Sequence, residues 1–340
     1  MSNVVISRLC NLSCPYCFAG EYMTRRDGHT GTHFIDLAEF ERKLDFLKRS
    51  GIKDLRLIGG EPTLHPQFSA LVDLGHNRGF HVLIFTNGLL SEVQCRHLEG
   101  FCEKDCTLLV NMNSQYSTDE QSADLQERRL AVMHRLPRLA APGFNIFSVD
   151  FDLNFLFQAI AETGCRSVIR LGLAHPILNG HNRFLHPKQY PIVGEKIAAY
   201  LPLAREMGVK FEFDCGFVRC MFSDEAVNAL TQTGSQPHFE CSPILDLDLG
   251  DGVFYCFSLA GKYRQSLNGV VTAAELREKM SDETDLFRFA GVYPTCSTCG
   301  YKNQGICSGG CLAGTIQRFT FAEIDGSQFG MQMSAERKMS

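Results

Sequence analysis

Short apolar runs alternate along most of the chain with longer segments in which apolar residues recur every three or four positions. The short runs predict buried strands, and the longer pattern predicts helices with one buried face. Six strands are expected at Val4–Ile6, Leu55–Ile58, Val82–Phe85, Leu108–Met112, Ile146–Val149 and Val168–Leu171. A further strand is expected at Val209–Phe213.

The clearest helical pattern spans Asp36–Ser50, where the apolar residues fall on one face. Asp36 and Glu39 have the spacing of a capping box, and Gly51 follows as a stop signal. Further helices are expected at Asp152–Thr163, which Gly164 ends, and at Pro191–Met207.

Strands that alternate with helices form a parallel sheet with right-handed crossovers, either open or curled toward a barrel. The expected fold class is α/β, a partial (β/α)6 TIM-like barrel followed by a small cysteine-rich domain. We expect the barrel core at residues 1–207, a bridging segment at 208–240 and the cysteine-rich domain at 241–340. In such folds the chemistry lies at the carboxyl ends of the strands.

Composition excludes several classes of function. The net charge of −5 and the absence of a strong Lys and Arg cluster argue against a nucleic-acid partner. The sequence has no signal-peptide pattern and no apolar stretch long enough to cross a bilayer, so we expect a cytoplasmic protein without a membrane partner. Fifteen cysteines in that compartment indicate metal or redox chemistry rather than disulfides.

The first cysteine group follows the first expected strand directly. Cys10, Cys14 and Cys17 form a C-x3-C-x2-C loop with no fourth cysteine nearby. Three thiolates on a four-iron cubane leave one iron free for another ligand, which a catalytic cluster needs and an electron carrier does not. The alternative is a zinc knot or a set of buried thiols, although zinc would require a fourth ligand close by.

This loop, with Tyr16 before its last cysteine, resembles the signature of the radical S-adenosylmethionine superfamily. The resemblance extends to Gly59-Gly60-Glu61 after the second strand and to Asn87 within Thr86-Asn87-Gly88 after the third. It implies a [4Fe–4S] cluster on the three cysteines and S-adenosylmethionine on the open iron. Reductive cleavage of that cofactor would give a 5′-deoxyadenosyl radical. The glycines and Glu61 would then hold the methionine ammonium.

Polar residues fall on one face of each later strand by the two-residue period. They are Asn111 and Asn113, Ser148 and Asp150, and Arg170 with Val168 and Gly172. One interpretation is a polar lumen in which Asn113 and Arg170 contact the ribose and the carboxylate of the cofactor. The other is an ordinary ion pair between Arg170 and Asp150 at a strand end.

Eight further cysteines follow residue 207 in a segment with few long helical patterns. Their spacing, Cys241-x14-Cys256 and then Cys296-x2-Cys299-x7-Cys307-x3-Cys311, resembles the SPASM or the shorter twitch extension. Those domains carry auxiliary [4Fe–4S] clusters. This chain departs from the pattern, because seven residues lie between Cys299 and Cys307 where five are usual, and no cysteine follows Cys311.

Two ligand arrangements stay open. In the SPASM-like one, a first cluster is held by Cys241, Cys256 and Cys311, with or without Cys220, and a second by Cys296, Cys299 and Cys307 with a substitute ligand or an open iron. In the twitch-like one, a single cluster is held by Cys241, Cys256, Cys296 and Cys299. A structural zinc ribbon is the alternative to both.

The remaining cysteines divide into two groups. Cys215 and Cys220 are either ligands or donors of a hydrogen atom to a substrate radical, which makes them the candidate catalytic residues. The others are expected to be buried structural thiols that pack as small hydrophobes. They are Cys95, Cys102, Cys106 and Cys165.

The resemblance implies a radical oxidoreductase or maturase. We expect it to modify a ribosomally made peptide by crosslinking, epimerisation or oxidation. The alternative is a dehydrogenase or rearrangement enzyme acting on a small molecule. The expected partners are an external electron donor, such as flavodoxin or ferredoxin, and for a peptide substrate either a separate recognition protein or direct leader binding. Because the first strand begins near Val4, no recognition domain is expected before the core.

Overall fold

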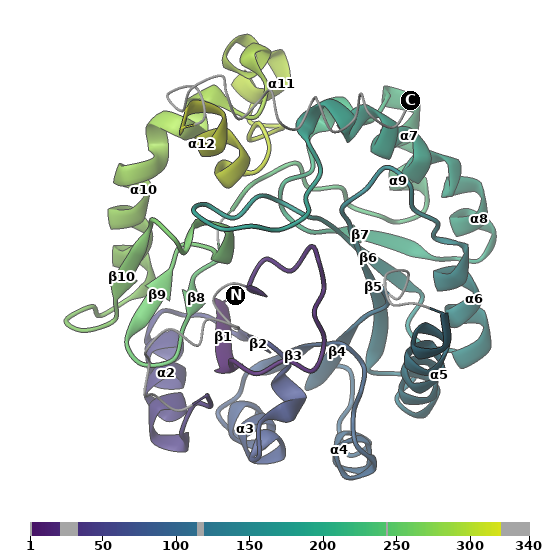
Figure 1. Cartoon of the computed structure of the whole chain (residues 1–340), viewed down its shortest axis with the longest axis vertical. Helices are drawn as coiled ribbons and strands as arrows, with labels where there is room; N and C mark the ends of the chain where they lie inside the picture. The colour runs from purple at the N-terminus through teal and green to yellow at the C-terminus, as the bar shows by residue number, and fades with distance from the viewer. Residues whose placement is uncertain (1, 21–32, 114–118, 243, 321–340) are drawn as a thin grey trace.

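The computed structural model describes residues 2–20, 33–113, 119–242 and 244–320. Its strands form one sheet in the order β10-β9-β8-β1-β2-β3-β4-β5-β6-β7. The strands from β1 to β7 run parallel and lie in an open arc with helices along its outer side (Figure 1). This arrangement confirms the predicted α/β fold with a partial parallel barrel.

The parallel strands of the arc appear in sequence order. They are β1 (Ser2–Ser7), β2 (Asp54–Gly59), β3 (His81–Thr86), β4 (Cys106–Asn111), β5 (Ala140–Ile146), β6 (Val168–Leu173) and β7 (Lys210–Phe213). The strand predicted at Val209–Phe213 is therefore the seventh of the arc. Three short strands from the last third of the chain extend the sheet beyond β1: β8 (Asp246–Leu247), β9 (Gly252–Phe254) and β10 (Arg264–Ser266).

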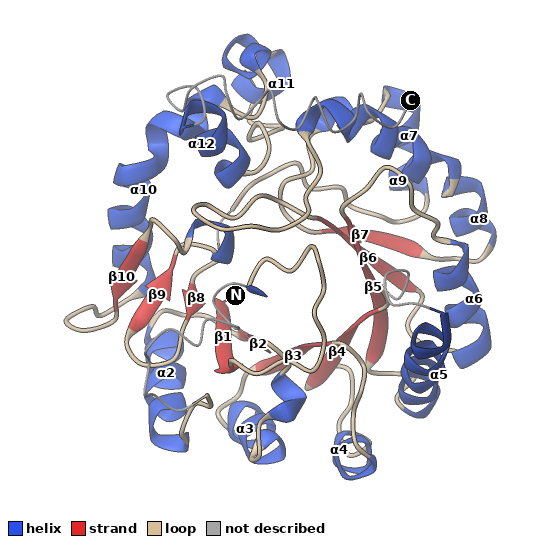
Figure 2. Cartoon of the chain, in the orientation of Figure 1, coloured by secondary structure: helices blue, strands red, loops and turns tan. Residues whose placement is uncertain are grey.

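Helices connect the parallel strands and cover the outer side of the sheet (Figure 2). They are α2 (Leu37–Arg49), α3 (Phe68–Asn77), α4 (Glu92–Leu98), α5 (Asp119–Arg135), α6 (Asn154–Thr163), α7 (Tyr190–Ala199), α8 (Leu201–Glu206) and α9 (Asp224–Gln232). The C-terminal segment adds α10 (Ala273–Ala290), α11 (Gly300–Asn303) and α12 (Leu312–Thr320). Short 3-10 turns include η1 (Pro62–Leu64), η2 (Pro187–Gln189), η3 (Arg219–Met221), η4 (Phe257–Leu259) and η5 (Pro294–Thr298).

The fifth strand lies earlier in the chain than predicted. It spans Ala140–Ile146, whereas the apolar pattern indicated Ile146–Val149. Pro142 and Gly143 disfavour strands in general, but here the carbonyl of Gly143 accepts from the N–H of Met112 and keeps the ladder to β4. Ser148 and Asp150 therefore lie in the loop after β5 and do not share a strand face.

The helix predicted at Pro191–Met207 is two helices, α7 and α8, which meet at Tyr200. Pro202 lacks an N–H group and its ring disfavours a continuous helix, so the chain bends there. The stop at Gly164 is confirmed, since that residue has a left-handed φ of 63° at the end of α6. That helix begins at Asn154, two residues later than predicted.

The first predicted helix is confirmed, but only half of its capping box forms. The carboxylate of Asp36 accepts from the N–H of Glu39 at 2.7 Å. The carboxylate of Glu39 accepts instead from the N–H of Gly250, also at 2.7 Å. The start of α2 is thus tied to the turn between β8 and β9, in the last third of the chain.

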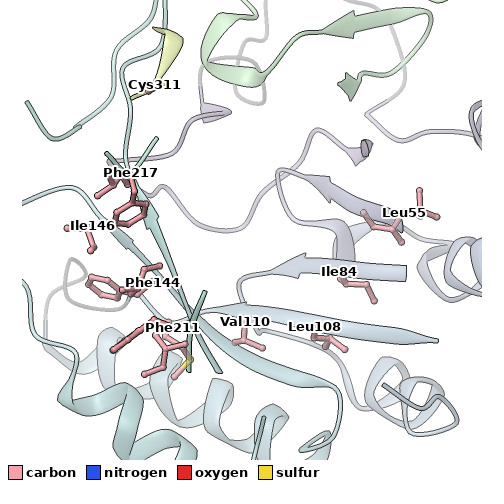
Figure 3. Packing of buried hydrophobic residues seen from close by; sticks show 14 of the residues in the cluster. Leu55, Ile84, Leu108, Val110, Phe144, Ile146, Phe211, Phe217 and Cys311 are labelled. Atoms are coloured by element: carbon pink, nitrogen blue, oxygen red, sulfur yellow. The ribbon is translucent and has the colours of Figure 1, made fainter. Parts of the chain in front are cut away.

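Buried apolar side chains from the strands form one large core (Figure 3). Leu55, Ile84, Leu108 and Val110 come from neighbouring strands and are fully buried. The core continues to Cys311, which is 4% exposed and belongs to the same cluster. Among the described residues, no helix combines the length and the apolar character that a membrane span needs.

Candidate active site

The loop that carries Cys10, Cys14 and Cys17 leaves the carboxyl end of β1 and crosses the interior of the arc (Figure 1). Its start is hydrogen-bonded to the end of β2. The N–H of Gly60 donates to the carbonyl of Ser7 at 2.8 Å, and the N–H of Glu61 donates to that of Leu9 at 2.7 Å. The loop therefore begins at a fixed position on the sheet.

The two glycines are required by this close approach. A Cβ atom on Gly59 would lie 2.1 Å from the carbonyl oxygen of Ser7, and one on Gly60 would lie 2.3 Å from that of Leu9. Contacts this short do not occur between real atoms, so any side chain would push the cysteine loop away. Here the glycine pair positions the loop, a role that the motif alone did not reveal.

The three thiols lie within electrostatic reach of one another. Burial raises the pKa of Cys10, Cys14 and Cys17, in the last case to about 12, and neighbouring thiols raise the pKa of Cys10 and Cys17 further. The N–H of Leu12 donates to the sulfur of Cys10 at 3.4 Å. Thiols that repel one another when ionised and receive backbone N–H groups fit a cationic iron centre.

Tyr16 lies beneath the loop and is 6% exposed. Its ring stacks on Phe147 with centroids 5.0 Å apart, and its hydroxyl accepts from the amide of Asn111 at 2.8 Å. Tyr16 thus connects the cysteine loop to the end of β4. This contact supports a positioning role for the aromatic residue.

Glu61 is 1% exposed, and its carboxylate is already surrounded by donors. One oxygen accepts from the N–H and the hydroxyl of Thr63 and from the hydroxyl of Thr86. The other accepts from the N–H of Asn87 at 2.7 Å. Burial still raises the pKa of Glu61. The side chain joins the ends of β2 and β3, and its second oxygen has capacity for one more donor.

Asn87 connects the third strand to the cysteine loop. Its amide donates to the side-chain oxygen of Asn11, between the first two cysteines, at 2.7 Å. Its carbonyl accepts from the Nε of Arg129 at 2.9 Å. The predicted site residues Tyr16, Gly59, Gly60, Glu61 and Asn87 therefore gather around one loop.

Arg129, from α5, is a candidate that the sequence analysis missed. It is 1% exposed, and its Nη1 atom has no hydrogen-bond partner among the described residues. Burial lowers its pKa, while Tyr16, Cys14 and Glu61 act on it in the opposite direction. A buried guanidinium with an unused donor is suited to bind an anion. In the sequence it appears only as one charge of an amphipathic helix.

Asn113 and Arg170 have protein partners. The amide of Asn113 exchanges two hydrogen bonds with the backbone of Asn145, at 2.7 and 2.9 Å, and so extends the pairing of β4 with β5. Arg170 forms an ion pair with Asp214 rather than with Asp150, and it lies over the ring of Phe85. It also lines a cavity of about 210 Å³ at the amino-end side of the sheet, on the side away from the cysteine loop.

The structure brings four distant cysteines together as a first C-terminal group: Cys215, Cys241, Cys256 and Cys311. Burial raises the pKa of each thiol, and Cys215, Cys241 and Cys256 are raised further by neighbouring thiols of the group. Backbone N–H groups at the start of α12 donate to the sulfurs of Cys241 and Cys311. Cys215 is accessible to solvent although protein surrounds it, as expected at the wall of an internal opening.

A second C-terminal group lies next to the first and consists of Cys220, Cys296, Cys299 and Cys307. Burial raises the pKa of Cys220 to about 11, and the other three thiols raise it further. Ser308 separates the two groups, because it follows Cys307 in the chain and its hydroxyl accepts from the N–H of Cys241 at 2.7 Å. All six predicted C-terminal ligands thus fall into two groups, each with one of the two candidate catalytic cysteines.

Among the described residues, no three cysteine, histidine or acidic side chains converge as the ligands of a single metal ion would. A cubane differs in this respect, because each thiolate binds its own iron atom and the sulfurs are spread around the cluster. The observation is therefore compatible with cluster sites at all three cysteine groups.

The four cysteines predicted to be structural are placed mostly as expected. Cys95, Cys106 and Cys165 are buried. Cys102 is exposed, which corrects that prediction, and its thiol donates to the carboxylate of Asp105 at 2.8 Å. The polar pattern around Cys102 in the sequence belongs to a surface turn before β4.

Comparisons with known proteins agree with this geometry. Residues 4–138 match the Radical SAM superfamily. Over 89 residues the chain is 38% identical to an S-adenosylmethionine-dependent nucleotide dehydratase of Selenomonas ruminantium, covering 26% of this chain and 30% of that protein. Over 148 residues it is 26% identical to a GTP 3',8-cyclase of Aeromonas hydrophila, covering 43% of each. The chain thus spans less than half the length of these curated relatives.

Two solved structures share the fold over most of the chain. Streptococcus suis SuiB bound to S-adenosylmethionine aligns with a TM-score of 0.60 and 15% identity, covering 93% of this chain and 73% of SuiB. The enzyme anSMEcpe with bound AdoMet aligns with a TM-score of 0.65 and 17% identity, covering 92% and 88%. Members of the matched superfamily are enzymes, so the chain is an enzyme, as predicted, and residues 4–138 are its radical SAM domain.

Proposed function

We propose that this protein is a radical S-adenosylmethionine enzyme that modifies a ribosomally made peptide. The observation that carries the first part is the cysteine loop, fixed by the Gly59-Gly60 contact at the carboxyl end of β1. A [4Fe–4S] cluster bound by Cys10, Cys14 and Cys17 would supply the electron that splits S-adenosylmethionine and starts hydrogen abstraction. Its fourth iron has no fourth cysteine from the loop.

The surrounding residues have separable tasks in this proposal. Tyr16 and Asn87 position the cysteine loop through Asn111 and Asn11. The free acceptor capacity of Glu61 is suited to the methionine ammonium, because a charge-assisted hydrogen bond is stronger than a neutral one. The unused donor of Arg129 is suited to the carboxylate of the same cofactor.

Asn113 and Arg170 remain candidates for cofactor contact with less support. The amide of Asn113 is engaged with the backbone of β5, and Arg170 is engaged with Asp214. A side chain that already has a strong partner must lose it before it binds a ligand. We therefore assign the carboxylate contact to Arg129 rather than to Arg170.

The first C-terminal group is proposed as an auxiliary [4Fe–4S] site with four protein ligands. Cys215 supplies the fourth thiolate beside Cys241, Cys256 and Cys311, and the amides at the start of α12 favour the ionised sulfurs. A ligand thiolate is not a hydrogen-atom donor. This assignment therefore favours a crosslink or an oxidation over an epimerisation.

A peptide substrate is supported by the fold comparison. SuiB, also solved with its precursor peptide SuiA, shares this fold over 79% of the chain with a TM-score of 0.56. The second candidate is a nucleotide or another small molecule, since a nucleotide dehydratase and a GTP cyclase are relatives in sequence. Those matches cover only 26% and 43% of this chain, so they leave most of the C-terminal segment unmatched.

The experiment that tests the radical function measures formation of 5′-deoxyadenosine from S-adenosylmethionine. Protein reconstituted without oxygen and reduced with dithionite should form it. The combined replacement Cys10→Ala, Cys14→Ala and Cys17→Ala should abolish it and leave the iron of the C-terminal groups. Undiminished cleavage by this variant would refute the radical assignment.

The substrate class is tested in the same assay. A peptide encoded beside this gene should increase 5′-deoxyadenosine formation and acquire a changed mass. GTP and other nucleoside triphosphates serve as the comparison. Modification of a nucleotide with no effect of the peptide would establish the second candidate in place of the first.

A further inference from the structure

The turn that carries Cys220 is rigidly held. This turn is η3, and the Nη1 of Arg219 donates to the carbonyl of Phe222 at 2.7 Å while its Nη2 pairs with Asp224. The turn packs directly on α7, because a Cβ atom on Gly194 would lie 1.9 Å from the carbonyl oxygen of Met221. Cys220 therefore has a fixed position although its side chain is exposed.

Both residues before Cys220 contact the C-terminal cysteine segments. The guanidinium of Arg219 lies over the ring of Tyr301, 4.8 Å from its centroid, and Tyr301 is two residues after Cys299. Val218 has a methyl group 3.0 Å from the point where a Cβ on Gly310 would lie. The turn is thus fitted against the segments on both sides of Cys307.

Those segments hold their own thiols in place by backbone contacts. The N–H of Cys299 donates to the carbonyl of Cys296 at 3.3 Å, and the N–H of Cys307 donates to the carbonyl of Tyr301 at the same distance. The N–H of Gly309 donates to the sulfur of Cys307 at 3.3 Å. Backbone N–H groups directed at cysteine sulfur are typical of iron–sulfur sites, where they stabilise the charge of the cluster.

We propose that Cys220 is the fourth protein ligand of a second auxiliary [4Fe–4S] site, completed by Cys296, Cys299 and Cys307. No cysteine follows Cys311 in the chain, so a ligand from the C-terminal side is absent from the sequence. The turn between β7 and α9 supplies it instead, from a point 76 residues before Cys296 (296 minus 220). The inference rests on the iron–sulfur chemistry proposed above, but its test does not depend on catalysis.

This assignment gives Cys220 a role other than hydrogen-atom donation. It also differs from an arrangement in which Cys296, Cys299 and Cys307 bind a cluster with one open iron. With four thiolates the second site would be coordinatively complete, and its role would be electron transfer rather than substrate binding. Because Cys220 and Cys299 reach the surface more than Cys296 and Cys307 do, this site lies where an external electron donor can approach.

The test is alkylation by iodoacetamide in the native state without oxygen, followed by mass spectrometry of each cysteine. Cys220 should react in iron-free protein and be protected at least tenfold after reconstitution with iron and sulfide. Cys102 is the matched control, since it is also exposed and lies far from the three groups, and it should react equally in both forms. Equal reaction of Cys220 in both forms would overturn the proposal.

A second measurement keeps this result separate from the radical function. Cys220→Ala should lower the iron content by about one to four atoms and give the electron paramagnetic resonance signal of an incomplete cluster, whereas Cys102→Ala should not. Protection of Cys220 should persist in the variant lacking Cys10, Cys14 and Cys17. If that variant loses cofactor cleavage while Cys220 remains unprotected, only the second site is refuted.

Discussion

The cysteine loop after β1 and the two C-terminal groups use the same residue type in opposite ways. The loop places three thiols within eight residues, Cys10 to Cys17, and supplies no fourth. Each C-terminal group collects four thiols from segments far apart in the chain, as far as Cys215 and Cys311. A site that must bind a further molecule is built locally with a ligand missing, and a site that is filled by protein also ties remote segments together.

The supporting contacts differ in the same way. The loop is positioned by glycines at the ends of strands, where the backbone of one strand presses on the next. The C-terminal groups are held by backbone N–H groups of short turns and of the first turn of α12. Damage to either region should therefore remove one kind of iron and spare the other.

The largest effect is expected from Gly60→Ala, which should break the loop alone. The new Cβ would lie 2.3 Å from the carbonyl oxygen of Leu9 and 2.9 Å from the nitrogen of Cys10, so the loop must move. We expect cofactor cleavage to fall about a hundredfold, since a shift of roughly 1 Å at a reacting centre has that effect. Iron at the C-terminal groups should stay.

Gly100→Ala is the control for this variant, because its nearest neighbour would be the carbonyl oxygen of His97 at 3.4 Å. Cleavage assays and iron analysis distinguish the outcomes. An active Gly60→Ala variant with its full iron content would show that the close contact is not needed.

A smaller effect is expected from Arg129→Gln, which tests whether the open side of the loop site is built for an anion. Loss of a charge-assisted hydrogen bond of about 1.5–3 kcal/mol should weaken binding of S-adenosylmethionine about ten- to a hundredfold. Iron content should be unchanged. Arg129→Lys should restore part of the affinity, since the charge returns without the planar donors.

Equilibrium binding to the reconstituted protein measures this change, and the iron content of each variant is determined alongside. Equal affinity of wild type and Arg129→Gln would remove Arg129 from the cofactor site and return the carboxylate contact to Arg170. A loss of iron together with affinity would indicate a structural role.

The smallest effect is expected at the junction of the two regions, where β8 pairs with β1. Burial raises the pKa of Asp246 to about 7, although Asn3 donates to its carboxylate at 2.5 Å. Arg56 also lowers that pKa, and Asp248 raises it. Because the folded carboxyl binds its proton more tightly than the unfolded one, stability should fall as the pH rises from about 4 to about 7.

Asp246→Asn should remove this dependence. The neutral amide keeps an oxygen for Asn3, so the variant should match wild type near pH 5 and be more stable by about 1–2 kcal/mol near pH 8. Thermal unfolding at the two pH values checks the prediction. A variant that is less stable than wild type at both would indicate that the ionised carboxylate has a favourable partner in the fold.

The repeating pattern of the chain was sufficient to predict most of the barrel. Alternating apolar runs have few possible arrangements once crossovers are right-handed, and six of the seven predicted strands lie within about two residues of the observed ones. The fifth did not, because Pro142 and Gly143 are ordinarily strand breakers and only the tertiary ladder to β4 outweighs that tendency.

The candidate site was predictable where its residues are adjacent in the chain. Cys10, Cys14, Cys17 and the Gly59-Gly60-Glu61 segment are local motifs, and their spacing carries the chemistry. Arg129 could not be found in this way, because a buried cation and an exposed one look the same in a helical pattern. The partition of eight C-terminal cysteines into two groups depends on the folding of distant segments, which spacing does not encode.

The pairing of β8 with β1 has a consequence for the order of assembly. Asn3 and Asp246 are paired across the sheet, so one edge of β1 stays open until the ribosome has released the last third of the chain. Such a distant contact carries a large loop-closure entropy and forms late. An open edge of a buried, apolar strand is prone to wrong pairing. The interval between synthesis of the third residue and the 247th is thus the time in which a nascent chain most needs protection by a chaperone.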